Sequence, residues 1–453
     1  MSDEATIENK FLNRLSDLAK VNDPIENDLY VKYDVKRGLR NANGTGVLVG
    51  LTRIGDVVGY EMKDGEKIAI PGRLVYRGYD VADLVKDADS NNMFGYEQCV
   101  YLLLFGKLPT KAELEEFTAF LGSKRVLPEH FTEDMIMKAP SSDIMNKLAR
   151  GVLASYSYDD NPEDRSIPNI LRQCIELISR FSTIVAYGYQ AKRRYYDGKS
   201  MYIHNPVPTL STAENFLRLI RSDKQYTDLE AKLLDLAMIL HAEHGGGNNS
   251  SLTVHVVSSA DTDTYSAIAA GVGSLKGRRH GGANIRVMEM MSEIKANVKD
   301  WSSESEIAAY LRKIVKKEAF DGSGLIYGMG HAVYTVSDPR CILLRDKAAI
   351  LAKEKNMEDE FNLYRIIEKL APQILYEKIG DRKQICANVD FYSGFVYTML
   401  NIPQELYTPI FAISRIAGWS AHRIEELVAG GRIYRPAYKN VSSERAYVPL
   451  ANR

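Results

Sequence analysis

A helical spacing of apolar side chains, repeated along most of the chain, is the feature that most constrains the fold. It is clearest in TDLEAKLLDLAMILHAEH, residues 227–244. Apolar residues recur there every three or four positions, on one face of a helix: Leu229, Leu233, Leu236, Ala237 and Leu240. Thr227 and Glu230 have the spacing of a capping box, which predicts the helix start. His244 continues the same face before three glycines, where we expect the helix to end. Since similar patterns dominate after about residue 77, the sequence predicts an all-α fold.

Two regions depart from this uniform pattern. Between residues 46 and 77, VGYEM and GRLVYRG lie among turn residues and predict a few short strands. Residues 282–388 form a Lys-, Glu- and Ala-rich helical stretch that is bounded by the glycines of RRHGG and the turn at NVD. We therefore expect a smaller helical domain at 282–388 and a large helical domain made of 1–281 and 389–453. No role is predicted for the first 40 residues.

The composition favours a soluble protein and gives no sign of nucleic-acid binding. The 453 residues are 45% hydrophobic and 26% charged, with a net charge of −1. The longest uninterrupted apolar run, CVYLLLF, is too short to span a bilayer, and MSDEATIENK does not resemble a signal peptide. The four cysteines form no CxxC pair, which fits a reducing compartment. We expect a cytoplasmic protein that binds neither nucleic acid nor membrane.

The stretch YGMGHAVYTVSDPR, residues 327–340, frames one histidine with glycines. Gly328 and Gly330 leave the backbone around His331 open to close approach. Asp338 and Pro339 have the pattern of an N-cap and a first helical turn, which predicts that Arg340 lies at a helix N-terminus. A guanidinium in that position suits a carboxylate ligand. The alternative is a glycine loop followed by an ordinary helix cap.

Three other positions suggest chemistry, each with a structural alternative. His280 in GRRHGGAN precedes a helical pattern, and the alternative is a solvated turn histidine. Asp390 in NVDFYSGF is either an N-cap or, in its apolar setting, a base with a raised pKa. Arg415 interrupts the apolar stretch FAISRIAGW, so it needs either a protein carboxylate or an anionic substrate.

Several known motifs do not fit. His241 and His244 are spaced for one helix face, but without HExxH or nearby cysteines we expect no metal site. GVGSLKG and GSGLIYG lack the dinucleotide spacing GxGxxG, and there is neither a P-loop nor a GxSxG elbow. Histidines, an aspartate and arginines together predict acid–base chemistry on a carbonyl-bearing di- or polycarboxylate.

The ordered motifs HAEHGGGN, RRHGGAN, GMGHAVYTVSDPR, NVDFYSG and SRIAGW, ending in YRP, resemble the citrate synthase family from about residue 70 to about 436. The resemblance implies an almost entirely helical fold and a homodimer. It also implies condensation of acetyl-CoA with oxaloacetate, followed by hydrolysis of citryl-CoA to citrate and CoA. Acetyl-CoA would be a co-substrate, and no cofactor would be permanently bound.

The resemblance implies the catalytic roles. Asp390 would take a proton from the methyl group of acetyl-CoA. His280 would donate a hydrogen bond to the thioester oxygen. His331 would polarise the ketone of oxaloacetate. An α-proton of a thioester is weakly acidic, so the base needs this stabilisation of the developing oxyanion.

The resemblance also implies the binding residues. Oxaloacetate would be held by four residues of the same chain: His244, Asn248, Arg340 and Arg415. Of these, Asn248 would orient its loop. Arg435 would reach in from the partner subunit. Gly328 and Gly330 would let the main chain approach the CoA adenine. Thr335 stands where many members carry Lys or Arg for a CoA phosphate. Lys276, Arg278 and Arg279, just before His280, are therefore the candidate phosphate ligands, and the alternative is a solvated basic turn.

Two other functions stay open. The first is 2-methylcitrate synthase, which uses propionyl-CoA with the same catalytic set. One methylene group in an apolar pocket is worth only about 1–3 kcal/mol, and the sequence does not define that pocket. The second is a non-catalytic structural member of the fold, which the intact catalytic triplet disfavours. A citryl-CoA lyase-type module is disfavoured because no ATP-binding segment is recognisable.

Overall fold

The computed structural model describes residues 2–41, 44–64, 66–380 and 384–453. The chain divides into two compact units, Met1–Leu51 and Thr52–Arg453. The described residues of the first unit include helices α1 (Ser2–Asn22) and α2 (Asn27–Lys32) and the 3-10 turn Arg37–Leu39. Its described side chains are largely exposed, so this unit has no core of its own.

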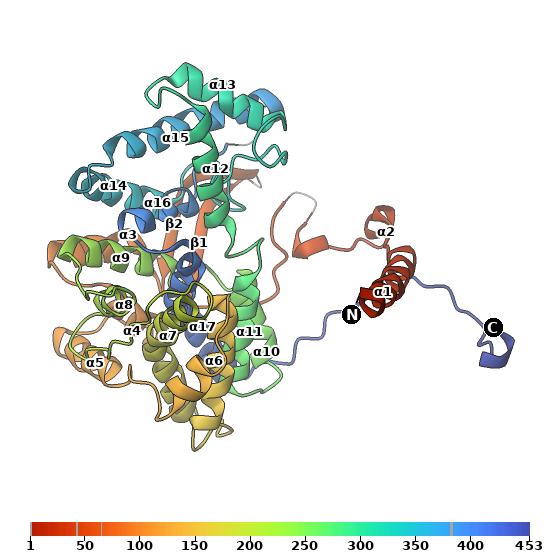
Figure 1. Cartoon of the computed structure of the whole chain (residues 1–453), viewed down its shortest axis with the longest axis horizontal. Coiled ribbons are helices and arrows are strands. Elements are labelled where there is room, and N and C mark those ends of the chain that lie inside the picture. Colours follow the sequence, from red (N-terminus) through yellow and green to blue (C-terminus); the bar gives the residue numbers. More distant parts are fainter. Residues whose placement is uncertain (1, 42–43, 65, 381–383) are drawn as a thin grey trace. The chain divides into compact units, whose positions relative to one another are not determined.

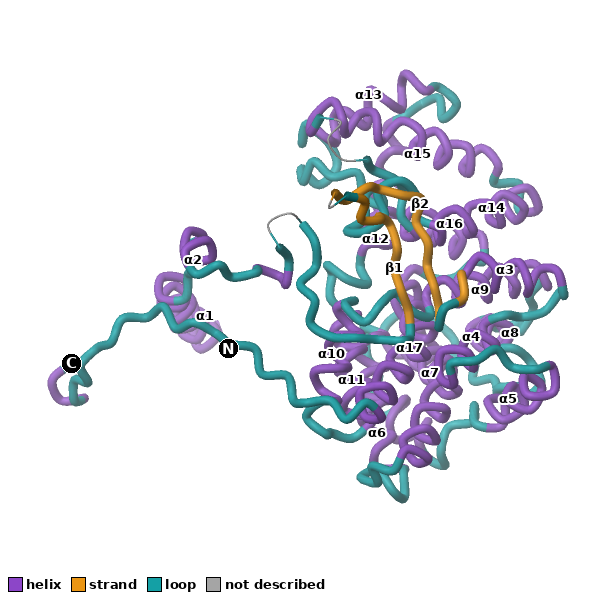
Figure 2. Tube along the Cα trace, turned by 180° about the vertical axis from the view of Figure 1, so that it is seen from behind, coloured by secondary structure: helices purple, strands orange, loops and turns teal. Residues whose placement is uncertain are grey.

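In its described residues the second unit is predominantly helical, with a small three-stranded sheet (Figures 1 and 2). Its strands are β1 (Gly55–Lys63), β2 (Glu66–Tyr76) and β3 (Tyr79–Asp80). The first helices are α3 (Val81–Ser90), α4 (Tyr96–Phe105), α5 (Lys111–Ser123), α6 (Ile144–Ser155), α7 (Ile167–Tyr195), α8 (Thr212–Ile220), α9 (Asp228–His241), α10 (Asn249–Ser258) and α11 (Thr264–Lys276). The later ones are α12 (Ala283–Asn297), α13 (Glu304–Val315), α14 (Pro339–Glu354), α15 (Glu358–Ile379), α16 (Val389–Met399) and α17 (Tyr407–Val428). The predicted all-α class with a few short strands is confirmed.

The sheet is antiparallel, in the order β1-β2-β3, and it supports the loop that carries His331. The backbone N–H of Gly72 on β2 donates to the carbonyl oxygen of Ser337 at 3.1 Å. The hydroxyl of Tyr334 donates to the carbonyl oxygen of Arg73 at 3.2 Å. The strands therefore fix a loop that lies more than 250 positions later in the chain.

Helix α17 forms the centre of the unit and packs against α4, α7, α9, α10 and α11. Its side chains are buried on nearly every face between Tyr407 and Arg423. A helix that is apolar all round is expected to lie inside a protein. The polar side chain of Arg415, in the middle of this segment, is thus placed deep in the fold.

Helices α12, α13, α14 and α15 gather at one end of the second unit, and α16 joins them to its centre (Figure 1). Helix α13 packs on α15, while α16 contacts both α12 and α14. Helices α12 to α15 fall inside the predicted small domain, 282–388, and α16 begins directly after it; the boundaries of this domain stay a prediction. No helix in the described parts of the chain is both long and apolar enough to cross a membrane.

The helix that the opening pattern predicts is present but shorter than expected. Thr227 and Glu230 form both hydrogen bonds of the capping box, as predicted. Helix α9 ends at His241, whereas the apolar pattern predicts that it continues to His244. The prediction is wrong at this end because Glu243 leaves the helix to pair with Tyr76 and His422. His244 therefore lies in a loop.

Candidate active site

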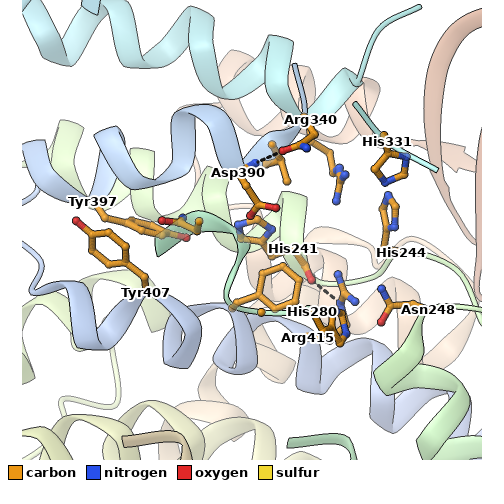
Figure 3. A pocket seen from close by; sticks show the side chains of 15 residues that line it. His241, His244, Asn248, His280, His331, Arg340, Asp390, Tyr397, Tyr407 and Arg415 are labelled. Atoms are coloured by element: carbon orange, nitrogen blue, oxygen red, sulfur yellow. Dashed lines mark hydrogen bonds between the residues drawn. The ribbon is translucent and has the colours of Figure 1, made fainter. Parts of the chain in front are cut away.

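A cavity of about 140 Å³ lies where the first turns of α10, α12, α14 and α16 meet α17 (Figure 3). Seven residues that the sequence predicts as catalytic or substrate-binding line it: His244, Asn248, His280, His331, Arg340, Asp390 and Arg415. They come from five separate segments of the chain. In Figure 3, His331, His244 and Asn248 lie along one side of the cavity, and Tyr397 and Tyr407 lie at the other.

Side-chain caps fix the start of three of these helices. Asn248 caps α10, Asp338 caps α14 and Asn388 caps α16. The amide oxygen of Asn388 accepts the backbone N–H of Asp390 at 3.0 Å. The N-cap alternative for Asp390 is therefore wrong, because its neighbour makes the cap and leaves the carboxylate to face the cavity. Helix N-termini favour bound negative charge.

Asp390 has the electrostatics of a base. Burial raises the pKa of its carboxyl group to about 6, while the nearby Arg340 guanidinium opposes that rise. At neutral pH the carboxylate is ionised, yet it binds a proton more strongly than an ordinary aspartate does.

The tautomer of His331 follows from its hydrogen bonds. Its Nδ1 accepts the backbone N–H groups of Val333 at 3.1 Å and Tyr334 at 3.0 Å. A neutral ring with Nδ1 as acceptor carries its proton on Nε2, which can then donate a hydrogen bond. The ring stacks on Tyr334 and meets the edge of His244 with a centroid distance of 5.2 Å.

His280 belongs to a buried hydrogen-bond network. Its Nε2 lies 3.1 Å from the hydroxyl oxygen of Ser250, which also accepts the indole N–H of Trp419 at 3.0 Å. The Ser250 hydroxyl donates to the amide oxygen of Asn248 at 2.9 Å. Burial and Arg415 lower the pKa of His280 to about 4, so the imidazole is neutral at physiological pH. The alternative of a solvated turn histidine is therefore wrong.

Arg340 is paired with its own helix cap. Asp338 accepts hydrogen bonds from the backbone N–H, Nε and Nη2 of Arg340 at 3.0, 3.0 and 2.8 Å. The same carboxylate accepts the backbone N–H of Val389 at 3.3 Å, which joins the start of α14 to that of α16. The predicted cap and helix start are confirmed. Arg340 reaches the cavity with its charge already balanced.

Arg415 is buried without such a partner. Its Nε donates to the carbonyl oxygen of His241 at 2.7 Å, but no described residue accepts a hydrogen bond from Nη1 or Nη2. Burial lowers the pKa of Arg415 to about 10, and the Glu243 carboxylate opposes this effect. No described carboxylate forms an ion pair with Arg415, so the alternative of a structural ion pair is wrong for the described residues. Two unpaired N–H groups in a buried cation indicate an anionic ligand.

Other polar atoms around the cavity also lack partners among the described residues: His241 Nδ1, His244 Nε2, Asn284 Oδ1 and Tyr397 OH. Buried polar groups are rarely left without hydrogen bonds in folded proteins. Their concentration here indicates a polar ligand with several hydrogen-bonding groups.

Four of the residues predicted to bind CoA lie outside the cavity lining. Lys276 forms an ion pair with Asp143 at 3.6 Å, and Arg278 is exposed in the turn before His280. Gly328 and Gly330 both adopt positive φ angles, of 81° and 90°.

These two glycines pair with the segment that precedes Asp390. The backbone N–H of Asn388 donates to the Gly328 carbonyl at 2.8 Å, and that of Gly330 donates to the Cys386 carbonyl at 2.7 Å. The pairing ties the His331 loop to the start of α16.

Arg435 also lies outside the cavity formed by its own chain. It is exposed in the segment that follows α17, which has no regular secondary structure before the final 3-10 turn. The neighbouring Tyr434 backbone N–H donates to Ser259 at 3.1 Å, at the end of α10.

The sequence does not predict the remaining lining residues: His241, Gly281, Asn284, Asn388, Val389, Tyr397, Tyr407 and Phe411. Some of them had a usable signal. Phe411 and Tyr407 precede Arg415 by four and eight positions, so they share its helix face, and Tyr397 follows Asp390 by seven. A metal site at His241 and His244 would need both side chains on one face of a helix. Helix α9 ends at His241, so the two residues do not share a helix face.

Comparisons with known proteins relate this chain to one family. The family model described as citrate synthase, C-terminal domain, matches residues 41–437. A citrate synthase from Acidithiobacillus ferridurans is 36% identical over 392 residues, which cover 84% of this chain and 93% of that protein. A 2-methylcitrate synthase from Shewanella oneidensis is 32% identical over 392 residues, which cover 84% of this chain and 92% of that protein.

A solved structure shares the fold. The ternary complex of citrate synthase from the archaeon Thermoplasma acidophilum with carboxymethyl coenzyme A and oxaloacetate matches with a TM-score of 0.73 and 26% identity. The match covers 92% of this chain and 99% of that one. Sequence and fold agree over most of both chains, and this chain belongs to the citrate synthase family.

Proposed function

We propose that the protein condenses acetyl-CoA with oxaloacetate and hydrolyses the resulting citryl-CoA to citrate and CoA. The observation that carries the proposal is one cavity lined by an aspartate with a raised pKa, neutral imidazoles and a guanidinium with unpaired N–H groups. The protein is thus an acyltransferase that forms a carbon–carbon bond. Side chains fill every chemical role, so the scheme uses no permanently bound cofactor.

The first step removes a proton from the methyl carbon of acetyl-CoA and gives it to Asp390. His280 stabilises the developing enol by donating a hydrogen bond from Nδ1 to the thioester oxygen. The Ser250 hydroxyl donates its single proton to the amide oxygen of Asn248 in this structure. This role requires that proton to turn to His280 Nε2, so that the ring proton lies on Nδ1.

The second step forms the carbon–carbon bond. His331 donates from Nε2 to the ketone oxygen of oxaloacetate, which makes the ketone carbon electrophilic. The enol carbon attacks that carbon, and the former ketone oxygen takes the Nε2 proton of His331 to become the hydroxyl group of citryl-CoA. The proton that Asp390 took from acetyl-CoA replaces the one that His331 gives up. Water then adds to the thioester carbonyl, and the carbon–sulfur bond breaks to release CoA and citrate.

Arginines hold the carboxylates of oxaloacetate. The Nη atoms of Arg415 supply a two-pronged donor, and Arg340 adds a second positive charge at the start of α14. His244 Nε2 adds a further polar contact, and Asn248 orients the loop. We also propose that the protein works as a homodimer in which Arg435 enters the partner's cavity. Its exposure outside the cavity of its own chain supports this.

CoA would lie across the turn before His280. Lys276 and Arg278 are exposed there and offer charge to the CoA phosphates. Gly328 and Gly330 would let the main chain of the His331 loop approach the adenine. We propose that 282–388 closes as a small domain over the bound substrates, which would exclude water until condensation is complete.

A cytoplasmic location completes the proposal. All four cysteines are free, and three of them are buried, which suits a reducing compartment. The small-molecule substrates require neither a nucleic acid nor a membrane.

A second candidate is 2-methylcitrate synthesis from propionyl-CoA. It is favoured by one observation, the 32% identity to a 2-methylcitrate synthase over 84% of this chain. The same catalytic residues would serve, and only the space for one extra methyl group would differ.

Release of free thiol from acetyl-CoA and from propionyl-CoA, each with and without oxaloacetate, tests both candidates. Oxaloacetate-dependent release that favours acetyl-CoA supports the proposal, and a preference for propionyl-CoA supports the second candidate. No release from either contradicts both and favours a non-catalytic member of the fold.

Asp390→Asn is the matched variant for this assay, because it keeps the side-chain shape and removes the base. We expect thiol release to fall by about 10²–10⁴-fold while the protein stays folded by circular dichroism. Unchanged release in this variant would remove Asp390 from its role.

A further inference from the structure

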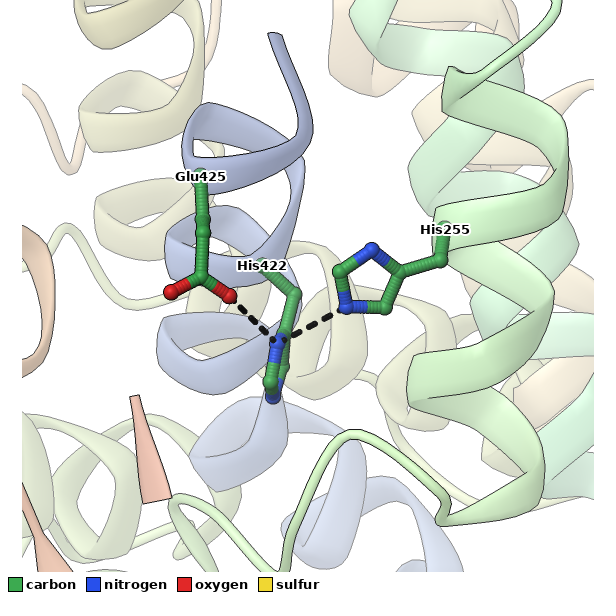
Figure 4. Close-up of side chains that lie close together, drawn as sticks. All are labelled: His255, His422 and Glu425. Carbon is green, nitrogen blue, oxygen red and sulfur yellow. Dashed lines mark hydrogen bonds and ion pairs between the residues drawn. The ribbon is translucent and has the colours of Figure 1, made fainter. Parts of the chain in front are cut away.

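A group of three side chains that could ligate a metal, two of them buried, lies outside the cavity (Figure 4). His255 on α10 faces His422 and Glu425 on α17, and the candidate ligand atoms all lie within 4.8 Å of one another. The two histidine side chains are 9% and 0% exposed, and that of Glu425 is 16% exposed. None of the three residues lines the cavity, so the proposed reaction does not use them.

Each histidine is oriented by a carboxylate on its outer ring nitrogen. Nδ1 of His255 lies 3.0 Å from Glu426, and Nε2 of His422 lies 3.0 Å from Glu243. Histidines that bind metals usually donate their second ring N–H to a carboxylate in this way, which fixes the tautomer and makes the other nitrogen a better ligand.

The inner ring nitrogens then face each other. Nε2 of His255 and Nδ1 of His422 are 3.0 Å apart. When both outer nitrogens carry protons, both inner nitrogens present lone pairs, and a positive species must lie between them. Two nitrogens at about 2.0–2.1 Å from a tetrahedral zinc ion are roughly 3.3 Å apart, so only a small opening of the pair is needed.

Glu425 supplies the third ligand. Its Oε2 lies 3.8 Å from Nδ1 of His422, and no described residue donates a hydrogen bond to this oxygen. Its other oxygen accepts the backbone N–H of Arg53 at 2.6 Å, which holds the carboxylate in place. A two-histidine, one-carboxylate set is typical of zinc and related cations.

We propose that His255, His422 and Glu425 bind a divalent transition-metal cation of the zinc class. The cation joins α10 to α17, the two helices that carry Ser250 and Arg415 toward the cavity. Glu243 connects the site to the loop of His244. The site is therefore structural, and its existence does not depend on the proposed reaction.

The test uses Co²⁺ as a spectroscopic probe on the chelator-treated full-length protein. We expect one Co²⁺ per chain after gel filtration, with the intense visible absorption of a tetrahedral site, and competition by Zn²⁺. His255→Gln and Glu425→Gln should abolish this absorption. Glu426→Gln keeps all three ligands and should weaken binding by about 10–100-fold.

His130→Gln is the control, because it removes an exposed histidine with a side chain 73% exposed and should change nothing. Absence of bound Co²⁺ in the folded wild-type protein would overturn the proposal. The positive species between the two histidines would then be a shared proton. Absorption that survives His255→Gln but disappears in His244→Gln would also overturn it, because the ion would then lie in the cavity. If His255→Gln does not fold by circular dichroism, the two glutamate variants decide.

Discussion

Arg340 and Arg415 line the same cavity, but they reach it from regions with different electrostatics (Figure 3). Arg340 lies in the first turn of α14 and is paired with Asp338, two residues earlier in the chain. Arg415 lies in the middle of α17, where only Nε has a described hydrogen-bond partner. One charge is balanced within the folded chain, and the other depends on a ligand.

The difference separates stability from binding. A buried ion pair becomes costly when one partner is removed, because the remaining charge stays desolvated. A buried guanidinium without an anion already bears that cost, and a bound carboxylate relieves it. The unpaired charge of Arg415 therefore favours the binding of an anion, whereas the ion pair of Arg340 mainly holds the starts of α14 and α16 together.

The largest effect is expected for Arg415→Met in the proposed reaction. The variant loses two hydrogen bonds to a charged carboxylate, worth about 1.5–3 kcal/mol each, so kcat/KM for oxaloacetate should fall by about 10²–10⁴-fold. Steady-state kinetics with varied oxaloacetate measures this loss. Oxaloacetate at a hundredfold excess over its Kd should raise the free energy of unfolding of the wild type by about 2.7 kcal/mol. The same concentration should not stabilise Arg415→Met. An unchanged KM would show that Arg415 does not bind the substrate.

Without substrate, we expect the loss of Arg340 to destabilise the fold more than the loss of Arg415. Arg340→Met leaves the buried Asp338 carboxylate without its cation, so the free energy of unfolding should fall by about 3–5 kcal/mol. Arg415→Met removes an unpaired charge and should change it by no more than about 1 kcal/mol. Urea denaturation of both variants and the wild type measures the difference. Equal losses would contradict the contrast between the two regions.

The same contrast explains what the sequence could predict. Asp338, Pro339 and Arg340 are consecutive, so their cap and helix start follow from local rules and are confirmed. The all-α class likewise follows from apolar spacing that recurs throughout the chain. The motifs also located seven of the residues that line the cavity.

Tertiary contacts account for most of what the sequence could not predict. The unpaired state of Arg415 depends on every neighbour of a central helix, and no local pattern reports it. The early end of α9 arises because Glu243 pairs with Tyr76 and His422, which lie far away in the chain. Ser250 has no motif of its own and gains its place only when α10 packs beside His280.

A smaller effect is expected in the pH dependence. Asp390 must be ionised to accept a proton, so kcat/KM should fall as the pH drops below about 6, the raised pKa of this carboxyl group. Arg340 lowers that pKa, so Arg340→Met should move the acidic limb to higher pH, whereas Arg340→Lys keeps the charge and should move it less. Arg415→Met should leave it near 6. A pH–rate profile of each variant tests this contrast, and equal shifts in all three would contradict it.

The linked stability effect has a defined sign. Folding raises the pKa of Asp390 from 3.8 to about 6, so the folded state binds more protons in this interval. Its contribution to the free energy of unfolding should therefore decrease as the pH rises from about 4 to about 6. Asp390→Asn should remove this dependence.

The smallest effect is expected for Ser250→Ala, which extends the comparison to the acetyl-CoA side of the cavity. Among the described residues the Ser250 hydroxyl forms hydrogen bonds with His280, Trp419 and Asn248 and with neither arginine. Its loss should lower kcat by about 10-fold, the value of one hydrogen bond, and leave KM for oxaloacetate unchanged. Ser250→Thr keeps a hydroxyl group and should restore activity. Ser251→Ala is the matched control, because that buried hydroxyl has no described hydrogen-bond partner. If Ser250→Ala raised KM for oxaloacetate instead, Ser250 would act through Asn248 and the carboxylate site rather than through His280.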